Sequence, residues 1–247
     1  MKLVAFDLDG TLAVSKQTIS KDIAKMLELL TEKYIVAIIS GGGFNWFKVQ
    51  LFTELDLPEK NKKNFYMMPS CGTEIYKFQN EDIEKIYSDK ISPEDRKRII
   101  KVVDNYFKNS KYFPKENYGD FIEERGEGQI TIACLGQHAP IEIKSKWDFD
   151  RKKRLEMISD LEKLLPEFGF KTGGTTSIDI TKKGIDKSVG MTKLMEVTGV
   201  EKKDIFFVGD MMSKGGNDYP VMEMGIKSIE TSGPENTREI IKKYLDI

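Results

Sequence analysis

Short apolar segments that end abruptly in acidic residues or glycine place the strongest constraint on the fold of this chain. Each segment has the length and composition of a buried strand, and the polar residues after it read as a loop. Ser20 is placed as the N-cap of a following helix, and apolar residues then recur at helical spacing from Ile23 to Leu30. Strands that alternate with helices favour a parallel sheet. The apolar segments are residues 2–6, 34–39 and 205–208.

The pattern changes in the middle of the chain. The Ser-Pro-Glu segment at residues 92–94 predicts the start of a helix. A further helix and two pairs of strands are expected after it, and the strand–helix alternation returns from Lys187. This order predicts an α/β protein with a Rossmann-like parallel-sheet core and an inserted α+β cap domain. We expect the core to comprise residues 1–88 and 184–247, and the cap residues 89–183.

Charge and composition exclude several classes of protein. The chain has 39 Lys and Arg residues against 40 Asp and Glu residues, so it lacks the broad basic field that nucleic acid requires. No apolar stretch approaches the roughly 18 residues that cross a bilayer, and the N-terminal apolar run is too short for a signal peptide. Cys71 and Cys134 lie far apart without the partners of a zinc site. We therefore expect a cytoplasmic protein that binds neither nucleic acid nor membrane.

Two acidic residues stand at the end of the first apolar segment. Asp7 and Asp9 are two positions apart, and residues at this spacing share a face of a strand. Two carboxylates at one site repel each other unless a cation lies between them. Oxygen ligands without His or Cys favour Mg²⁺ over zinc. The pair therefore indicates a magnesium site, and the alternative is an acidic turn that is simply solvated.

Other polar residues are expected at the same edge of the sheet, because each follows a predicted strand or opens a predicted helix. Ser40, followed by glycines, offers a hydroxyl and backbone amides for a phosphate oxygen. Lys187 supplies a positive charge, although a lone lysine at a helix start is usually a surface residue. Together these residues predict a site for magnesium and phosphate. The members are Ser40, Gly41, Gly42, Lys187, Asp210, Asn217 and Asp218.

Four segments resemble the motifs of the haloacid dehalogenase superfamily of aspartyl phosphotransferases. In chain order they are residues 7–11 (Asp-Leu-Asp-Gly-Thr), Ser40, residues 184–187 (Gly-Ile-Asp-Lys), and residues 209–210 with 216–218. The insertion between the second and third resembles the cap of subfamily IIB.

The superfamily resemblance implies a role for each matching residue. Asp7 would be the nucleophile, Asp9 the general acid and base, and Lys187 the charge that balances a phosphoaspartate. Magnesium would be held by Asp7, the Asp9 carbonyl and Asp210, with Asp218 and Asn217 supporting the metal shell. Ser40, Gly41, Gly42 and Lys187 would bind the phosphate.

The resemblance extends over nearly the whole chain to the eukaryotic-type phosphomannomutases. The similar stretches are residues 6–12, 121–125, 177–180 and 215–218. It implies interconversion of the 1- and 6-phosphates of mannose or glucose, with Mg²⁺ and a sugar bisphosphate activator. It also implies a cap that binds a second phosphate through arginines and the sugar through a serine and an aspartate.

Three cap and entrance residues match the substrate-binding residues of that family, and three depart from them. Those that match are Arg125, Ser177 and Asp179. Arginine of the family is replaced by Lys16, Gln137 and Lys144. Lysine keeps the charge but loses the bidentate geometry, and glutamine loses both. These departures favour the alternative of a sugar-phosphate phosphatase, which needs only one phosphate site.

Two further points stay open at this stage. A phosphoacceptor signalling domain also uses acids, a lysine and Mg²⁺, but the inserted cap and the nucleophile pair on the first strand count against it. Trp147 and Phe149 fit either the core of the cap or the surface of a homodimer formed through the cap. The expected partner in every enzymatic reading is a small phosphorylated sugar.

Overall fold

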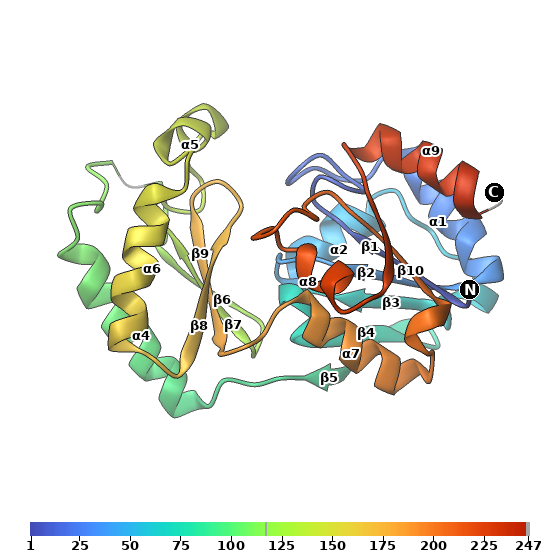
Figure 1. Ribbon diagram of the computed structural model, residues 1–247, viewed down its shortest axis with the longest axis horizontal. Helices are drawn as coiled ribbons and strands as arrows, with labels where there is room; N and C mark the ends of the chain where they lie inside the picture. The colour runs from blue at the N-terminus through green and yellow to red at the C-terminus, as the bar shows by residue number, and fades with distance from the viewer. Residues whose placement is uncertain (117, 246–247) are drawn as a thin grey trace. The chain divides into compact units, whose positions relative to one another are not determined.

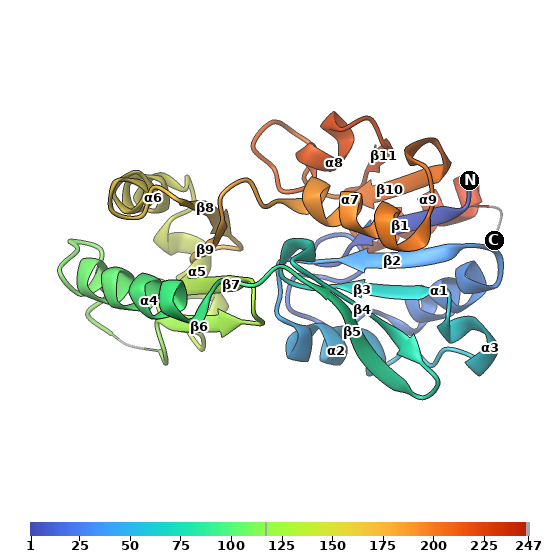
Figure 2. The ribbon, with the colours of Figure 1, turned by 90° about the horizontal axis from the view of Figure 1, so that it is seen from below.

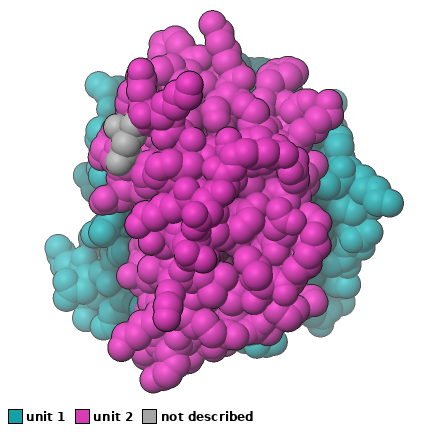
Figure 3. All heavy atoms as spheres, turned by 90° about the vertical axis from the view of Figure 1, so that its left-hand side faces the viewer, with its two compact units in different colours: residues 1–88, 186–247 teal, residues 89–185 magenta. Residues whose placement is uncertain are grey.

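The computed structural model describes residues 1–116 and 118–245, and the chain divides into two compact units. The first unit comprises residues 1–88 and 186–247, and the second comprises residues 89–185 (Figure 3). The chain returns to the first unit at Asp186, two residues after the expected position. Each unit has its own sheet and its own apolar core.

The first unit is an α/β core built on a sheet of seven strands in the order β11-β10-β1-β2-β3-β4-β5 (Figure 1). The strands from β11 to β3 are parallel, and β4 and β5 are antiparallel. The strand bounds are β1 Leu3–Asp7, β2 Ile35–Ile39, β3 Phe65–Met68, β4 Glu74–Gln79, β5 Asp82–Ser88, β10 Ile205–Gly209 and β11 Lys227–Glu230. The mostly parallel sheet with crossover helices confirms the predicted fold class of the core.

Helices cover both faces of this sheet, as Figure 2 shows. Their bounds are α1 Lys21–Lys33, α2 Phe44–Phe52, α3 Glu59–Lys62, α7 Lys187–Thr198, α8 Tyr219–Glu223 and α9 Pro234–Leu245, with 3-10 turns η1 Ser70–Gly72 and η2 Lys202–Asp204. Alternate residues of β1 explain the two layers. Val4 and Phe6 pack with α1, α2 and α9, whereas Leu3 and Ala5 pack with α7 and α8. Both faces of β1 are therefore buried, which accounts for its uninterrupted apolar sequence.

The second unit is the cap, a four-stranded antiparallel sheet in the order β6-β7-β9-β8. The bounds are α4 Pro93–Lys108, β6 Ile122–Arg125, β7 Gln129–Ala133, α5 Ile141–Trp147, α6 Lys152–Leu164, β8 Phe168–Gly173 and β9 Ser177–Lys182. Helices α4 and α6 lie on one face of the sheet, where isoleucines of β7 and β9 form the core with them (Figure 1). The opposite face carries polar residues of β6, β7 and β9, because strand residues alternate between faces.

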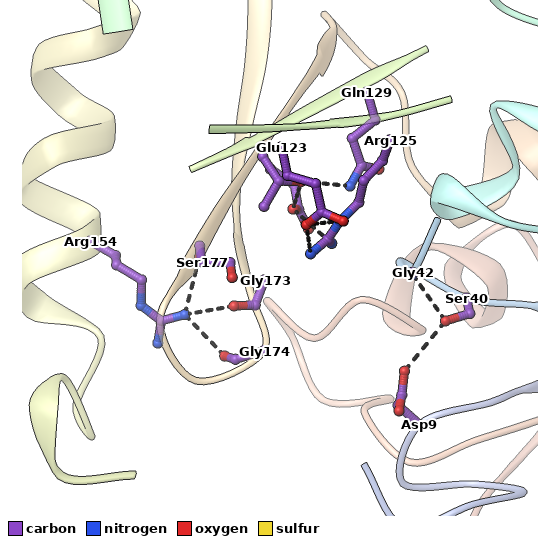
Figure 4. Close-up of polar contacts among 12 residues, drawn as sticks. Asp9, Ser40, Gly42, Glu123, Arg125, Gln129, Arg154, Gly173, Gly174 and Ser177 are labelled. Atoms are coloured by element: carbon purple, nitrogen blue, oxygen red, sulfur yellow. Dashed lines mark hydrogen bonds and ion pairs between the residues drawn. The ribbon is translucent and has the colours of Figure 1, made fainter. Parts of the chain in front are cut away.

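The basic run at residues 151–154 does not lie wholly on the surface of the cap. Arg151 and Lys152 are exposed, but Arg154 is only 2 % exposed. Its Nε atom donates to Asp148 at 2.8 Å, and its guanidinium also donates to the carbonyl groups of Gly173 and Gly174 at 3.0 Å each (Figure 4). Arg154 therefore fastens α6 to the turn between β8 and β9.

Two aromatic residues of the cap have different surroundings. Trp147 packs against the apolar core of the cap, whereas Phe149 is 91 % exposed. A homodimer through the cap stays a prediction. Among the described residues, no helix combines the length and the apolar character needed to cross a membrane.

Candidate active site

A buried lysine between two carboxylates forms the centre of the site in the α/β core. Asp7 is the last residue of β1, and Lys187 is the first residue of α7. The Lys187 Nζ atom contacts Asp7 Oδ1 and lies 2.6 Å from Asp218 Oδ1. All three side chains are at most 3 % exposed. Burial alone would lower the pKa of Lys187, but Asp218 and Asp7 together raise it above its usual value. Lys187 is therefore a fixed positive charge, not a surface residue.

Asp218 connects this lysine to the loop after β10. Its Oδ2 atom accepts from the backbone N–H groups of Asp210 and Met211, each at 3.1 Å. Since its Oδ1 atom faces Lys187, both of its oxygens are engaged by protein donors. Gly209 is required beside it, because a Cβ there would lie 2.6 Å from the Asp218 carboxylate. The supporting role of Asp218 in a metal shell stays a prediction.

The acidic cluster fits a divalent cation. Carboxylate oxygens of Asp7, Asp210 and Asp218 lie within 4.8 Å of one another. The Asp7 Oδ2 atom is buried and has no hydrogen-bond partner among the described residues. Burial, assisted by Asp218 and Asp210, raises the pKa of Asp7 to about 8 against the opposing effect of Lys187. Burial and Asp218 likewise raise the pKa of Asp210 to about 6. The single positive charge of Lys187 does not balance the negative charges of three ionised carboxylates, so the cluster has room for a cation. Because all the donor atoms are oxygens, Mg²⁺ suits the site.

Gly10 brings the loop after β1 against Asp210. Its φ angle is +88°, which favours glycine, and a Cβ at this position would lie 2.3 Å from Asp210 Oδ2. A larger residue would push Asp210 out of the acidic cluster. The glycine after Asp9 therefore has a structural reason to be there.

The Asp9 carboxylate is not a member of this acidic cluster. It lies beyond Asp7, the last residue of β1, so the alternation of a strand no longer directs its side chain. Its Oδ1 atom accepts from the Lys16 backbone N–H at 2.8 Å and from Gln50 Nε2 at 3.1 Å. The Asp9 backbone carbonyl remains the group that the family resemblance assigns to the metal.

The loop after β2 organises the expected phosphate-binding residues. Ser40 is buried, its hydroxyl accepts from the Gly42 N–H at 3.1 Å, and it lies 3.5 Å from Asp9 Oδ2 (Figure 4). The turn η1 holds this loop, since Ser70 N–H donates to Gly42 O and Cys71 N–H to Ser40 O, each at 2.8 Å. Helix α2 starts directly after Gly43. The hydroxyl of Ser40 is thus placed beside Asp9 in a fixed loop.

The cap residues Arg125, Ser177 and Asp179 lie on the polar face of the cap sheet. The Arg125 guanidinium faces Glu123 Oε2 with Nε at 2.9 Å, and another of its nitrogens is 3.5 Å from Asp179 Oδ1 (Figure 4). Thr131 donates to the same Asp179 oxygen at 2.7 Å. Burial raises the pKa of Asp179 above its usual value, although Arg125 and Thr131 act against this. Arg125 therefore has two carboxylate neighbours within the cap.

The remaining predicted residues are Lys144 and Gln137 of the cap and Lys16, Asn217 and Gly41 of the core. Lys144 is buried, and its Nζ atom donates to the Gln137 carbonyl at 2.8 Å, so these two cap residues are in contact. Lys16 is exposed and has a left-handed backbone with a φ angle of +58°. Asn217 is exposed in the loop that contains Asp218, and Gly41 is half-buried beside Ser40.

Gln50 and Glu123 are among the residues of the polar networks that were not predicted from the sequence. Gln50 is fully buried, and it lies three positions after Phe47 on the buried face of α2. A glutamine within an apolar helical stripe is the signal that could have identified it. Glu123 gave no comparable signal, because an acidic residue in a strand is ordinary on a solvated face.

The α/β core with an inserted cap, and the acid–lysine cluster at the ends of β1 and β10, define a protein of the haloacid dehalogenase superfamily. The sequence model of the eukaryotic phosphomannomutases matches residues 23–247, so the chain belongs to this family of enzymes.

Relatives of known name cover nearly the whole chain. Phosphomannomutase 2 of Dictyostelium discoideum is 28 % identical, and the match covers 97 % of this chain and 94 % of the relative. The phosphomannomutase of Saccharomyces cerevisiae is 26 % identical, with 99 % and 94 % covered.

Solved structures share the fold at lower sequence identity. SMU.1108c from Streptococcus mutans has a TM-score of 0.67 at 16 % identity, and the match covers 100 % of this chain and 99 % of that protein. A mutant of Plasmodium falciparum IMP-nucleotidase with bound IMP also has a TM-score of 0.67, at 18 % identity, covering 100 % of this chain and 67 % of that protein. These likenesses establish the fold with its cap.

Proposed function

We propose that the protein transfers phosphoryl groups on a sugar phosphate through an aspartyl-phosphate intermediate on Asp7. The proposed reaction is that of a phosphomannomutase, which interconverts mannose or glucose 1-phosphate and the corresponding 6-phosphate with a sugar bisphosphate as activator. The observation that carries the proposal is the side chain of Asp7, in a chain of this family: it contacts Lys187, and its buried Oδ2 atom has no hydrogen-bond partner among the described residues. A carboxylate oxygen without a protein donor is available to a metal or to phosphorus.

The residues of the core divide the chemistry between them. Asp7 attacks the phosphorus, and Lys187 offsets the negative charge of the resulting phosphoaspartate. Asp9 gives a proton to the leaving sugar oxygen and later takes one from the incoming hydroxyl. The Ser40 hydroxyl and the loop to Gly43 bind phosphate oxygens. Asp7, the Asp9 carbonyl and Asp210 would hold magnesium, which when bound would supply positive charge beside the phosphoryl group.

Magnesium should stabilise the protein as well as support activity. At a concentration about 100 times its dissociation constant, a ligand of the folded state adds about 2.7 kcal/mol to the free energy of unfolding. We expect Mg²⁺ to raise the thermal midpoint of the wild type and of Asp56→Asn, an exposed control. Asp210→Asn should show little or no rise, because it removes a ligand. Equal rises in all three proteins, or full activity in excess chelator, would show that the acidic cluster has another role.

A phosphatase of the same superfamily is the second candidate, and the cap gives a specific reason to keep it. A mutase must hold a second phosphate while the intermediate reorients. The residue best suited to this, Arg125, already faces Glu123 and Asp179, so an incoming phosphate must compete with two carboxylates. Gln137 and Lys144 supply one positive charge where the family has two arginines. A weaker second phosphate site would release free phosphate.

The two candidates differ in what Arg125→Ala does. We expect this variant to lower isomer formation at least about tenfold while hydrolysis falls much less, since a charged hydrogen-bonding group is lost only for the second phosphate. Isomer and free phosphate are to be measured together from mannose 1-phosphate with a hexose bisphosphate. Arg98→Ala on the exposed face of α4 is the matched control. Free phosphate without isomer in the wild type would establish the phosphatase.

A further inference from the structure

We propose that Gln50 positions the Asp9 carboxylate, so that Asp9 Oδ2 is the oxygen that exchanges the proton with the substrate. The inference rests on the proposed phosphoryl transfer and adds a positioning residue to it. Gln50 lies on α2, away from the family motifs that identified the other residues, and its side chain is fully buried.

The hydrogen bonds of Gln50 fix the orientation of its amide group. Its Nε2 atom donates to Asp9 Oδ1 at 3.1 Å and to the Gln17 carbonyl at 3.0 Å. The Gln17 carbonyl and an ionised Asp9 carboxylate accept hydrogen bonds and donate none. The amide nitrogen of Gln50, and not its oxygen, must therefore face them. The Oε1 atom is then buried without a hydrogen-bond partner among the described residues.

A buried acceptor without a partner is unfavourable, and an apolar residue would avoid it. Phe47 and Leu51, the other residues on this face of α2, are apolar and pack in the core. A glutamine here is therefore not explained by stability alone. Its contact with Asp9 supplies the explanation.

Both fixed donors act on the same oxygen of Asp9. The Lys16 backbone N–H joins Gln50 on Oδ1 at 2.8 Å, where Lys16 has a left-handed backbone with a φ angle of +58°. The other oxygen, Oδ2, has the Ser40 hydroxyl as its contact, at the long distance of 3.5 Å. Oδ1 is thus engaged by two donors, and Oδ2 is left to carry the proton.

Gln50 also holds the loop that carries Lys16. In addition to the side-chain bond to Gln17, the Ile19 N–H donates to the Gln50 carbonyl at 3.0 Å. The side chain and the backbone of Gln50 therefore both fasten the segment between Asp9 and α1 to helix α2. A carboxylate fixed in this way keeps the same oxygen toward the reacting group throughout the cycle.

The orientation matters when the phosphorus–oxygen bond of the substrate breaks. An oxygen of Asp7 forms a bond to phosphorus, the bond from phosphorus to the sugar oxygen breaks, and its electron pair stays on that oxygen. The sugar oxygen then takes the proton from Asp9 Oδ2, because an alkoxide is a poor leaving group. With p-nitrophenyl phosphate the leaving p-nitrophenolate is stable without that proton. A fault in the position of Asp9 should therefore affect the sugar ester and spare the aryl ester.

The test compares the two esters in Gln50→Leu. Single-turnover release of mannose from mannose 1-phosphate should fall by about tenfold to a hundredfold, a part of what general acid catalysis contributes. Release of p-nitrophenol should fall by less than about threefold, and the KM for mannose 1-phosphate should stay unchanged. Gln50→Glu, which turns a second carboxylate toward Asp9, should lose more on the sugar ester. Gln79→Glu, the same change on the exposed end of β4, should match the wild type.

The outcomes separate the inference from the proposed function. Equal losses on both esters, or an unchanged rate on the sugar ester, would overturn the positioning role of Gln50. If Gln50→Leu does not fold, Gln50→Glu carries the same comparison. A wild type that releases neither leaving group would overturn the proposed function itself, and the inference with it.

Discussion

Asp7→Asn is expected to abolish turnover, with a loss of more than about ten-thousandfold, while the protein stays folded. The carboxamide of asparagine does not attack phosphorus, so no covalent intermediate can form. Asparagine has nearly the same shape as aspartate, and the strand neighbours of β1 are unchanged by the substitution. The measurement is the turnover of mannose 1-phosphate beside the far-ultraviolet circular dichroism of the same preparation.

The matched control for this prediction is Asp56→Asn, which makes the same chemical change at an exposed position. It should keep the wild-type rate. Substantial activity in folded Asp7→Asn protein would mean that another residue or a water molecule attacks the phosphorus. The role of Asp7 as a nucleophile would then be refuted, although the acidic cluster could still bind a metal.

Lys187→Met should lower both activity and stability. Methionine fills the space of the lysine but leaves Asp7 and Asp218 buried without their cation. Removing one partner from a buried ion pair typically costs about 3–5 kcal/mol of the free energy of unfolding. Activity should also be lost, because the charge on a phosphoaspartate is no longer offset. Urea unfolding in the presence of a chelator measures the stability without interference from metal.

A second substitution distinguishes the two effects of Lys187. The double variant Lys187→Met with Asp218→Asn removes one of the uncompensated carboxylates, so it should recover part of the lost stability. It should not recover activity, since the cation is still absent. A Lys187→Met protein as stable as the wild type would show that the buried lysine does not compensate these acids.

The sequence was sufficient for the residues whose position follows from strand ends and helix starts. Asp7 ends β1 and Asp210 follows β10, and these neighbouring parallel strands bring their carboxyl ends together. Lys187 is the first residue of α7, as the predicted start of this helix required. The parallel core and the inserted cap followed from the same pattern. Strands β3 and β11 were missed, because a segment of four residues is too short to show a period.

The contacts that depend on tertiary packing could not be predicted. Strand alternation placed Asp9 beside Asp7, but the chain leaves the strand at Asp7, and the Asp9 side chain points to Ser40 and Gln50. The pairing of Arg125 with Glu123 depends on side-chain conformation, and the burial of Arg154 depends on a turn about twenty residues away in sequence. Such contacts have no local pattern that would reveal them.

Detection of a phosphorylated Asp7 tests the central claim most directly. The wild type is quenched in acid during turnover of mannose 1-phosphate with Mg²⁺ and a hexose bisphosphate, then digested and analysed by mass spectrometry. We predict an acyl phosphate on the peptide that contains Asp7, sensitive to hydroxylamine and absent from Asp7→Asn. Formation of mannose 6-phosphate without phosphate on Asp7, or with phosphate on another residue, would contradict the proposed mechanism.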